Sequence, residues 1–199
     1  MPGQDAPTVD TLTKSQAARR QRVILAALDL ASEGGYDSVQ MRDVAARANV
    51  ALGTIYRYFS SKDSLLASAM VEWVTELEKT VRARPPAGDR TGDRVMDVLN
   101  RALRAMERQP QLTAAVVTAL TSGDPAGVEA LNGMTSALAR IMGAAFPDGG
   151  DPVMEASAVK VLGHVWWSGL IGWANGMGDM AWVSAELREA ADILTPRFD

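Results

Sequence analysis

The segment from Ala45 to Phe59 restricts the possible folds of this chain more than any other feature. Its residues predict the end of one short helix, a tight turn at Asn49 and a second short helix rich in Thr, Tyr and Arg. Such a pair forms a helix-turn-helix, which presents its second helix to the major groove of DNA. An ordinary helical hairpin is the alternative interpretation, and the flanking residues favour the first.

The flanking residues predict a helix on each side of this segment. Upstream, apolar residues recur at helical spacing: Ile24, Ala27, Leu28 and Ala31. This helix should end at Gly34-Gly35, because glycine is common where helices stop. Downstream, Ser60 or Ser61 should cap a long helix whose positive end is suited to Asp63. Three short helices leading into a long one therefore predict a DNA-binding head.

Charge is distributed unevenly along the chain. The net charge is −4, yet residues 14–62 hold eight Lys and Arg against four Asp and Glu, which gives +4. Residues 63–199 carry −6 and residues 1–13 carry −2. The basic excess therefore lies in the predicted head, where it would meet phosphates. Solvated helix faces also carry such charge, so the asymmetry supports DNA binding only together with the helix-turn-helix motif.

Composition predicts a protein of the cytoplasm that has no membrane partner. The chain contains no Cys, which excludes disulfides and fits a reducing compartment. Residues 1–13 are polar, so we expect a flexible arm and no signal peptide. No apolar run approaches the roughly 20 residues that span a bilayer.

The residues offer little for catalysis. The only histidine, His164, lies in an apolar helical segment, where an imidazole packed in the core is the better interpretation. The chain shows no phosphate-binding glycine loop, no metal-ligand spacing and no serine in a nucleophile elbow. We therefore predict that the protein is not an enzyme and that it uses neither cofactor nor metal.

The remainder of the chain predicts an all-α body. Breaks at residues 84–89, 123–125 and 147–150 separate segments with helical spacing, and no alternating strand pattern occurs. We expect three parts: a flexible arm (1–13), a DNA-binding domain (14–60), and a helical domain for ligand binding and dimerisation (61–199).

Ten Met and five Trp predict an adaptable apolar interior. Ordinary core packing is the alternative for each of them. If the middle helices form a bundle, their inward faces carry few charges and suit a bulky apolar ligand better than a small polar one. The expected lining residues are Trp73, Leu77, Met96, Leu99, Leu103, Met106, Leu120, Leu138, Met142 and Trp166.

Residues 161–178 are apolar on nearly all sides, and such a helix needs more than one partner. A central core helix is one explanation, and a dimer interface is the other. We favour the dimer because a palindromic DNA site requires a two-fold symmetric protein. Glycines at 169, 172 and 176 would allow a second backbone to approach. The predicted interface residues are Trp167, Leu170, Ile171 and Gly172.

Four pieces of residues 15–70 point to a known family: Gly35-Tyr36, Met41-Arg42-Asp43-Val44-Ala45, Gly53-Thr54-Ile55-Tyr56-Arg57-Tyr58-Phe59 and Lys62-Asp63-Ser64-Leu65-Leu66. Together they resemble the N-terminal domain of TetR-type transcriptional repressors. The resemblance implies a small DNA-binding head on a larger helical body, and a homodimer that binds a palindromic double-stranded operator.

A narrower resemblance concerns residues 15–22, 34–36, 39–42, 50–54 and 100–113. They look like the actinobacterial repressors of cholesterol and steroid catabolism, which implies a steroid-derived acyl-CoA thioester as the inducer. A fatty acyl-CoA or another hydrophobic inducer is the alternative. A helical lipid carrier without a DNA role is a further alternative, but it would leave residues 40–62 unexplained.

Candidate DNA contacts lie at both ends of the motif. Tyr56 and Tyr58 can donate their hydroxyls to phosphates, and Lys62 can add a positive charge at the start of the next helix. The family resemblance implies that Gln40 and Arg42 contact the DNA backbone or a base edge.

The expected recognition helix opens with small and apolar residues. Thr54 can hydrogen-bond a base or touch a thymine methyl, and Ala51 and Leu52 offer apolar contacts. Gly53 permits close approach to the DNA. Leu52 stands where members of the resembled family usually carry a polar residue. The remaining apolar residues of this helix, Ile55 and Phe59, should anchor it in the core of the head.

Overall fold

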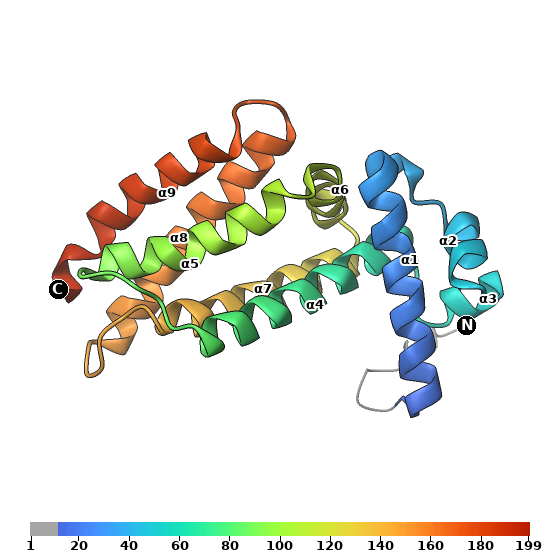
Figure 1. Cartoon of the computed structure of the whole chain (residues 1–199), viewed down its shortest axis with the longest axis horizontal. Helices are drawn as coiled ribbons and strands as arrows, with labels where there is room; N and C mark the ends of the chain where they lie inside the picture. Colours follow the sequence, from blue (N-terminus) through green and yellow to red (C-terminus); the bar gives the residue numbers. More distant parts are fainter. Residues whose placement is uncertain (1–11) are drawn as a thin grey trace. The chain divides into compact units, whose positions relative to one another are not determined.

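The computed structural model describes residues 12–199, apart from the side chain of residue 135, and over this part it is entirely helical (Figure 1). The elements in chain order are α1 (Lys14–Ser38), α2 (Met41–Ala48), α3 (Leu52–Tyr56), α4 (Lys62–Ala83), α5 (Thr91–Glu107), α6 (Pro110–Thr121), α7 (Pro125–Gly143), α8 (Pro152–Ala174), α9 (Met180–Leu194) and the 3-10 turn η2 (Pro196–Phe198). The predicted all-α class is confirmed. None of the described helices is long and apolar enough to cross a membrane.

The start of α1 is fixed by a capping box. Thr13 accepts a hydrogen bond from the backbone N–H of Gln16 at 3.3 Å, and the Gln16 side chain accepts one from the Thr13 N–H at 2.8 Å. Of the predicted flexible arm, residues 1–13, the first eleven lie outside the described residues. Near the other end of α1, Gly34 and Gly35 leave the helical conformation, as their sequence predicts, and Gly35 has φ +70°.

The chain divides into two compact units. The head unit comprises residues up to Met70 together with Pro110–Ala130, and the body unit comprises Val71–Gln109 and Leu131–Asp199. This division differs from the predicted boundary after residue 60. The reason is α6, whose Ala115 and Ala119 are buried in the same cluster as α1. Both α4 and α7 begin in the head unit and continue into the body unit.

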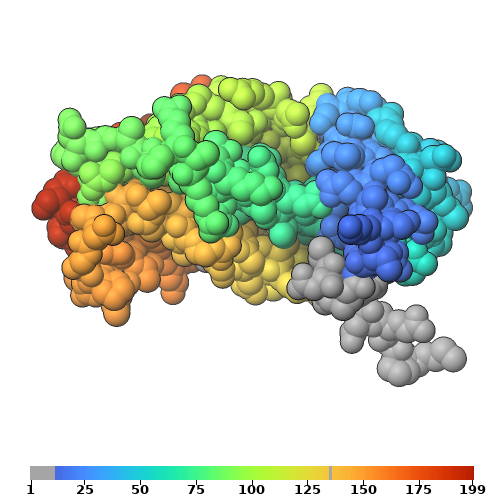
Figure 2. Space-filling view, turned by 60° about the horizontal axis from the view of Figure 1, so that its bottom comes forward, coloured from blue at the N-terminus to red at the C-terminus, as the bar shows by residue number. Residues whose placement is uncertain are grey.

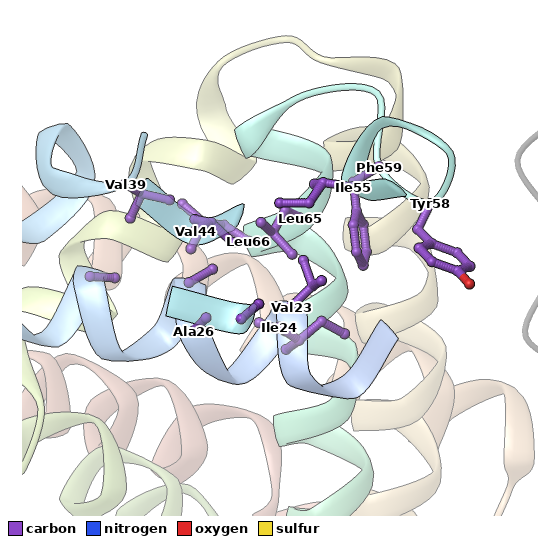
Figure 3. Packing of buried hydrophobic residues seen from close by; sticks show 14 of the residues in the cluster. Val23, Ile24, Ala26, Val39, Val44, Ile55, Tyr58, Phe59, Leu65 and Leu66 are labelled. Atoms are coloured by element: carbon purple, nitrogen blue, oxygen red, sulfur yellow. The ribbon is translucent and has the colours of Figure 1, made fainter. Parts of the chain in front are cut away.

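A single apolar cluster holds the head unit together (Figure 3). Val23 and Ile24 of α1 share this cluster with buried residues of α2, of the segment 55–59 and of the first turns of α4. Ile55 and Phe59 are at most 1% exposed, which confirms their predicted role as anchors. Burial of such side chains contributes about 1.5–3 kcal/mol each, so the short α3 is stabilised by its packing rather than by its length.

In the body unit, α5 and α8 both pack against α9. Two α5 arginines tie the surrounding loops to this packing. Arg101 pairs with Asp97 and donates to the carbonyl oxygens of Arg84 and Pro85, at 2.6 and 3.2 Å. Arg94 donates to the carbonyl oxygen of Ala145 at 2.8 Å. Figure 2 shows the segments around residues 85–95, 145–155 and 195–199 gathered at one end of this unit.

Candidate functional site

The turn between α2 and α3 is built by Asn49. This residue adopts the left-handed conformation (φ 52°, ψ 55°), and its backbone N–H donates to Ala46 O at 3.2 Å. Asn tolerates this conformation better than most residues with a side chain. The next N–H, that of Val50, donates back to Ala45 O at 3.0 Å. The chain therefore reverses within two residues, and the predicted turn at Asn49 is confirmed.

The outer surface of the motif carries most of the predicted DNA contacts. Exposed positions are Gln40, Arg42, Ala51, Gly53 and Tyr56, of which Tyr56 is 52% exposed. Leu52 and Thr54 are half-buried. The Gln40 amide donates to the Asp37 carbonyl oxygen at 2.9 Å, so this side chain is held against the turn that precedes α2.

Nothing in the described part of the chain requires a glycine at position 53. A Cβ added there would meet nothing within 4 Å, and its φ lies in the ordinary range. An exposed helical glycine is less stable than alanine by roughly 0.5–1 kcal/mol. No steric demand from residues 12–199 explains this glycine, whereas close approach of a DNA surface would.

Tyr58 is more buried than the other predicted DNA contacts. Its side chain is only 7% exposed and belongs to the apolar cluster, with its ring 6.3 Å from that of Phe59. The Tyr58 hydroxyl lies at the outer edge of this cluster (Figure 3), where it accepts a hydrogen bond from Arg57 Nη2 at 3.1 Å. The ring is therefore fixed in the core, and the hydroxyl that is predicted to donate to a phosphate stays at the edge of the cluster with its own hydrogen uncommitted.

Lys62 is held by the end of α1. Its ammonium lies 3.6 Å from the centroid of the Tyr36 ring and donates to the Tyr36 carbonyl oxygen at 3.3 Å. The Tyr36 hydroxyl in turn donates to Asp63 at 2.6 Å. Burial first, and then this hydrogen bond, raise the pKa of Tyr36 to about 12. These contacts join α1 to α4 and fix where the Lys62 charge lies.

The start of α4 is capped as its sequence predicts. Ser61 Oγ accepts a hydrogen bond from the backbone N–H of Ser64 at 2.9 Å, which identifies Ser61 rather than Ser60 as the cap. The same hydroxyl donates to Asp124, in the turn between α6 and α7, at 2.8 Å. No local sequence pattern indicates this second contact, because the two residues are 63 positions apart.

The predicted ligand-lining residues are divided between the two units. Leu120 belongs to the head unit, whereas the other nine belong to the body unit. Seven of those nine are buried, and Trp73 and Leu138 are half-buried. A surface pocket described by the structure lies elsewhere, at residues 147–151, 154 and 197–199, and contains none of the predicted lining residues.

The predicted dimer interface needs two corrections, because α8 already uses part of that surface to meet α9. Leu170 is fully buried within the subunit. A Cβ at Gly172 would lie 2.9 Å from the ring of Trp182, and one at Gly169 would lie 2.9 Å from Val183. Gly169 and Gly172 thus allow close packing of α9 from the same chain, and not of a second subunit.

Another face of α8 is still accessible. Trp167 and Ile171 are half-buried, and Val161, which the sequence prediction omitted, is 44% exposed. Residues 161, 164, 168 and 171 follow helical spacing. On α9, Ile193 is 68% exposed. The spacing of residues 161, 164, 168 and 171 would identify this accessible face of α8 from the sequence only if the position of α9 were already known.

Two family models match most of the chain. Residues 23–69 match the model of bacterial regulatory proteins of the tetR family, and residues 88–194 match the tetracyclin repressor-like C-terminal domain. The HTH-type transcriptional repressor KstR of Rhodococcus jostii is 34% identical over 185 residues, which cover 93% of this chain and 86% of that protein.

Solved structures agree with these matches. A TetR transcriptional regulator from a Rhodococcus species is 30% identical with a TM-score of 0.81, and the match covers 94% of this chain and all of that one. FadR of Thermus thermophilus, a TetR-family repressor in complex with lauroyl-CoA, is 18% identical with a TM-score of 0.68, over 88% of this chain and 92% of that one. At this identity the second likeness shows the fold alone.

Proposed function

This chain belongs to the TetR family of bacterial transcriptional regulators, and we propose that it is a homodimeric repressor of lipid or steroid catabolism genes, released from a palindromic operator by a hydrophobic inducer. The family consists of regulators and not of enzymes, in agreement with the sequence prediction. The observation that carries the proposal is the likeness to KstR over more than nine-tenths of the chain.

The geometry of the head supports contact with DNA through α2 and α3. Of the α3 residues only Gly53 and Tyr56 are exposed, and the missing side chain of Gly53 lets the helix backbone come close to base edges. We assign phosphate contacts to Tyr56 and to Lys62, whose position is fixed by Tyr36. Gln40 and Arg42, at the start of α2, would add contacts to the DNA backbone or to a base edge.

An apolar inducer is supported by the interior of the body unit. Leu99, Leu103, Met142 and Trp166 are at most 4% exposed and come from three different helices. We propose that the steroid or acyl part of a CoA thioester enters among them, and that the exposed Arg104 and Arg108 meet its phosphates. The fold is compatible with such a ligand, since FadR of Thermus thermophilus holds lauroyl-CoA.

Release would follow from a change in α4. This helix runs from the head unit into the body unit, so a tilt at one end is passed along it. The inducer can drive that tilt only if it binds the state that is not competent for DNA more tightly. In a dimer, tilting both α4 helices alters the spacing of the heads, and two half-sites then cannot be contacted together.

The decisive experiment begins with duplexes selected from a randomised pool by the purified protein. The selected complex is then titrated with a steroid acyl-CoA, the free steroid acid and a long-chain acyl-CoA. We expect release by the steroid acyl-CoA. Release by the free acid alone would remove the thioester from the proposal, and release by none of the three would remove the apolar inducer. Failure to select any duplex would support a lipid carrier.

A pair of variants tests the location of the inducer. Leu103→Trp fills the interior and should abolish release while leaving DNA affinity near that of the parent. Met142→Leu conserves volume and should leave release intact, because such exchanges usually cost less than about 1.5 kcal/mol. Thermal unfolding of both variants confirms that each is folded. Normal release from folded Leu103→Trp would place the inducer elsewhere.

A further inference from the structure

Arg57 is the only basic residue between Arg47 and Lys62, and it directly follows α3. Its side chain is exposed. Among the described residues, no carboxylate lies within ion-pair distance of its guanidinium. Arg47 of α2 differs in this respect, because Glu33 holds its guanidinium through two bonds of 2.7 and 2.9 Å. Arg57 therefore presents a charge that no carboxylate of residues 12–199 neutralises.

Tyr58 orients this charge. Arg57 Cζ lies 5.0 Å from the centroid of the Tyr58 ring, and Nη2 donates to the Tyr58 hydroxyl at 3.1 Å. The ring is itself fixed, since it packs in the apolar cluster of the head (Figure 3). A guanidinium has five N–H donors, and this arrangement uses one of them. Four donors remain on a planar group that has already lost much of its conformational freedom.

The position of Arg57 suits a base edge. It lies four residues after Gly53, so both are on one face of the short recognition helix. With a rise of about 1.5 Å per residue, four residues span only about 6 Å. Long helical side chains lean towards the N-terminus, which is the end of a recognition helix that meets the bases. The missing Cβ of Gly53 leaves this path open.

No other side chain of the recognition helix offers two donors in one plane. Ala51, Leu52 and Thr54 cannot do so, and Tyr56 has a single hydroxyl. Guanine presents two acceptors, O6 and N7, in the major groove, and arginine matches them bidentately. We propose that Arg57 reads a guanine in each half-site and that Tyr58 is its positioning residue. This inference rests on the proposed DNA-binding function.

The test compares base preferences of the parent, Arg57→Lys, Arg57→Ala and Tyr58→Phe. The duplex selected by the parent is the probe, with each base pair replaced in turn. We expect the parent to lose roughly 5- to 150-fold in affinity when one particular guanine is replaced, as for a bidentate contact. Both Arg57 variants should lose most of this discrimination, since lysine keeps the charge but not the planar pair of donors.

Tyr58→Phe separates orientation from packing. It keeps the ring and removes the hydroxyl, so we expect a weaker preference at the same guanine with little change in the midpoint of thermal unfolding. Arg47→Ala is the charge-matched control, and it should leave that preference intact. An unchanged preference in folded Tyr58→Phe would overturn the positioning role.

A contact with phosphate would give a different result. Arg57→Lys would then keep full affinity and preference, and Arg57→Ala would weaken binding to all duplexes with a salt slope smaller by about one. That outcome, or no effect of either variant, would overturn the base contact. If the parent selects no duplex, the proposed function fails first, which distinguishes the two failures.

Discussion

Ser61 donates a hydrogen bond of 2.8 Å to the carboxylate of Asp124, and this one contact joins the start of α4 to the start of α7. Each partner also caps its own helix. Ser61 accepts from the Ser64 N–H at 2.9 Å, and the other oxygen of Asp124 accepts from the Ala126 N–H at 2.8 Å. The two helix starts are therefore joined by the same two side chains that cap them.

Replacing Ser61 by alanine should destabilise the protein through this contact. The variant loses the cap of α4 and leaves Asp124 without its Ser61 donor, so we expect the free energy of unfolding to fall by about 1–2 kcal/mol. Chemical denaturation measures this change. Ser60→Ala is the control, because Ser60 is exposed, and it should stay within about 0.5 kcal/mol of the parent. Equal effects of the two variants would contradict the assignment of the cap.

Gly53→Ala should stabilise the protein and weaken its binding to DNA. The new Cβ meets nothing within the chain, so the helix gains roughly 0.5–1 kcal/mol. The same methyl group would keep the backbone of α3 away from the bases. Gly133→Ala in α7 is a matched control, because a Cβ there also meets nothing within 4 Å.

Both glycine variants should be more stable than the parent in thermal unfolding, and only Gly53→Ala should lose affinity for the selected duplex. Equal DNA affinity of Gly53→Ala and the parent would show that nothing approaches this position closely.

The burial of Tyr36, together with its hydrogen bond to Asp63, predicts a loss of stability at high pH. The pKa of Tyr36 is raised to about 12, whereas an unfolded tyrosine titrates near about 10. The folded protein therefore keeps a proton that the unfolded chain releases. This contribution to the free energy of unfolding is complete below about pH 10 and declines as the pH rises towards about 12.

Ultraviolet absorbance of tyrosinate measures this pKa directly. The difference between the titrations of the parent and of Tyr36→Phe isolates Tyr36 from the other two tyrosines. A titration midpoint of about 10 for Tyr36 in the folded protein would contradict the predicted rise in its pKa.

Local sequence patterns predicted the parts of this structure that depend on local chemistry. Asn49 marks the turn because it tolerates the left-handed conformation, and Gly34-Gly35 interrupts α1 for a related reason. The anchors Ile55 and Phe59 follow from their spacing. Helical spacing also accounts for the different burial of Tyr56 and Tyr58, which are two residues apart and point to nearly opposite sides of a helix.

Contacts between distant segments could not be predicted in this way. α8 is apolar on nearly all sides, so its sequence did not reveal which face would meet α9 and cover Leu170. The same applies to α6, whose burial against α1 places Leu120 in the head unit. The hydrogen bond between Ser61 and Asp124 likewise depends on how α4 and α7 pack, which no local pattern indicates.

Gly169→Ala tests the packing of α8 against α9. The new Cβ would lie 2.9 Å from Val183 Cγ1, and overpacking of this kind costs about 1–3 kcal/mol. Gly163→Ala on the same helix meets nothing within 4 Å and should not destabilise the protein. The double variant Gly169→Ala/Val183→Ala should recover part of the loss in thermal unfolding. Full stability of the single variant would contradict this packing.

The accessible face of α8 leads to a sharper test of dimerisation than Leu170 allows. An Asp at the fully buried Leu170 would unfold the subunit itself, so it cannot report on an interface. Val161→Glu places a charge on a side chain that is 44% exposed in the single subunit, and it should leave the subunit folded. If this face forms the dimer, the charge is buried without a partner and the dimer dissociates. Light scattering should therefore show a dimer for the parent and a folded monomer for Val161→Glu.

Val128→Glu is the matched control, because Val128 is 52% exposed on α7, and it should remain dimeric. A dimeric Val161→Glu would place the interface elsewhere, and a monomeric parent at micromolar concentration would remove the homodimer from the proposal.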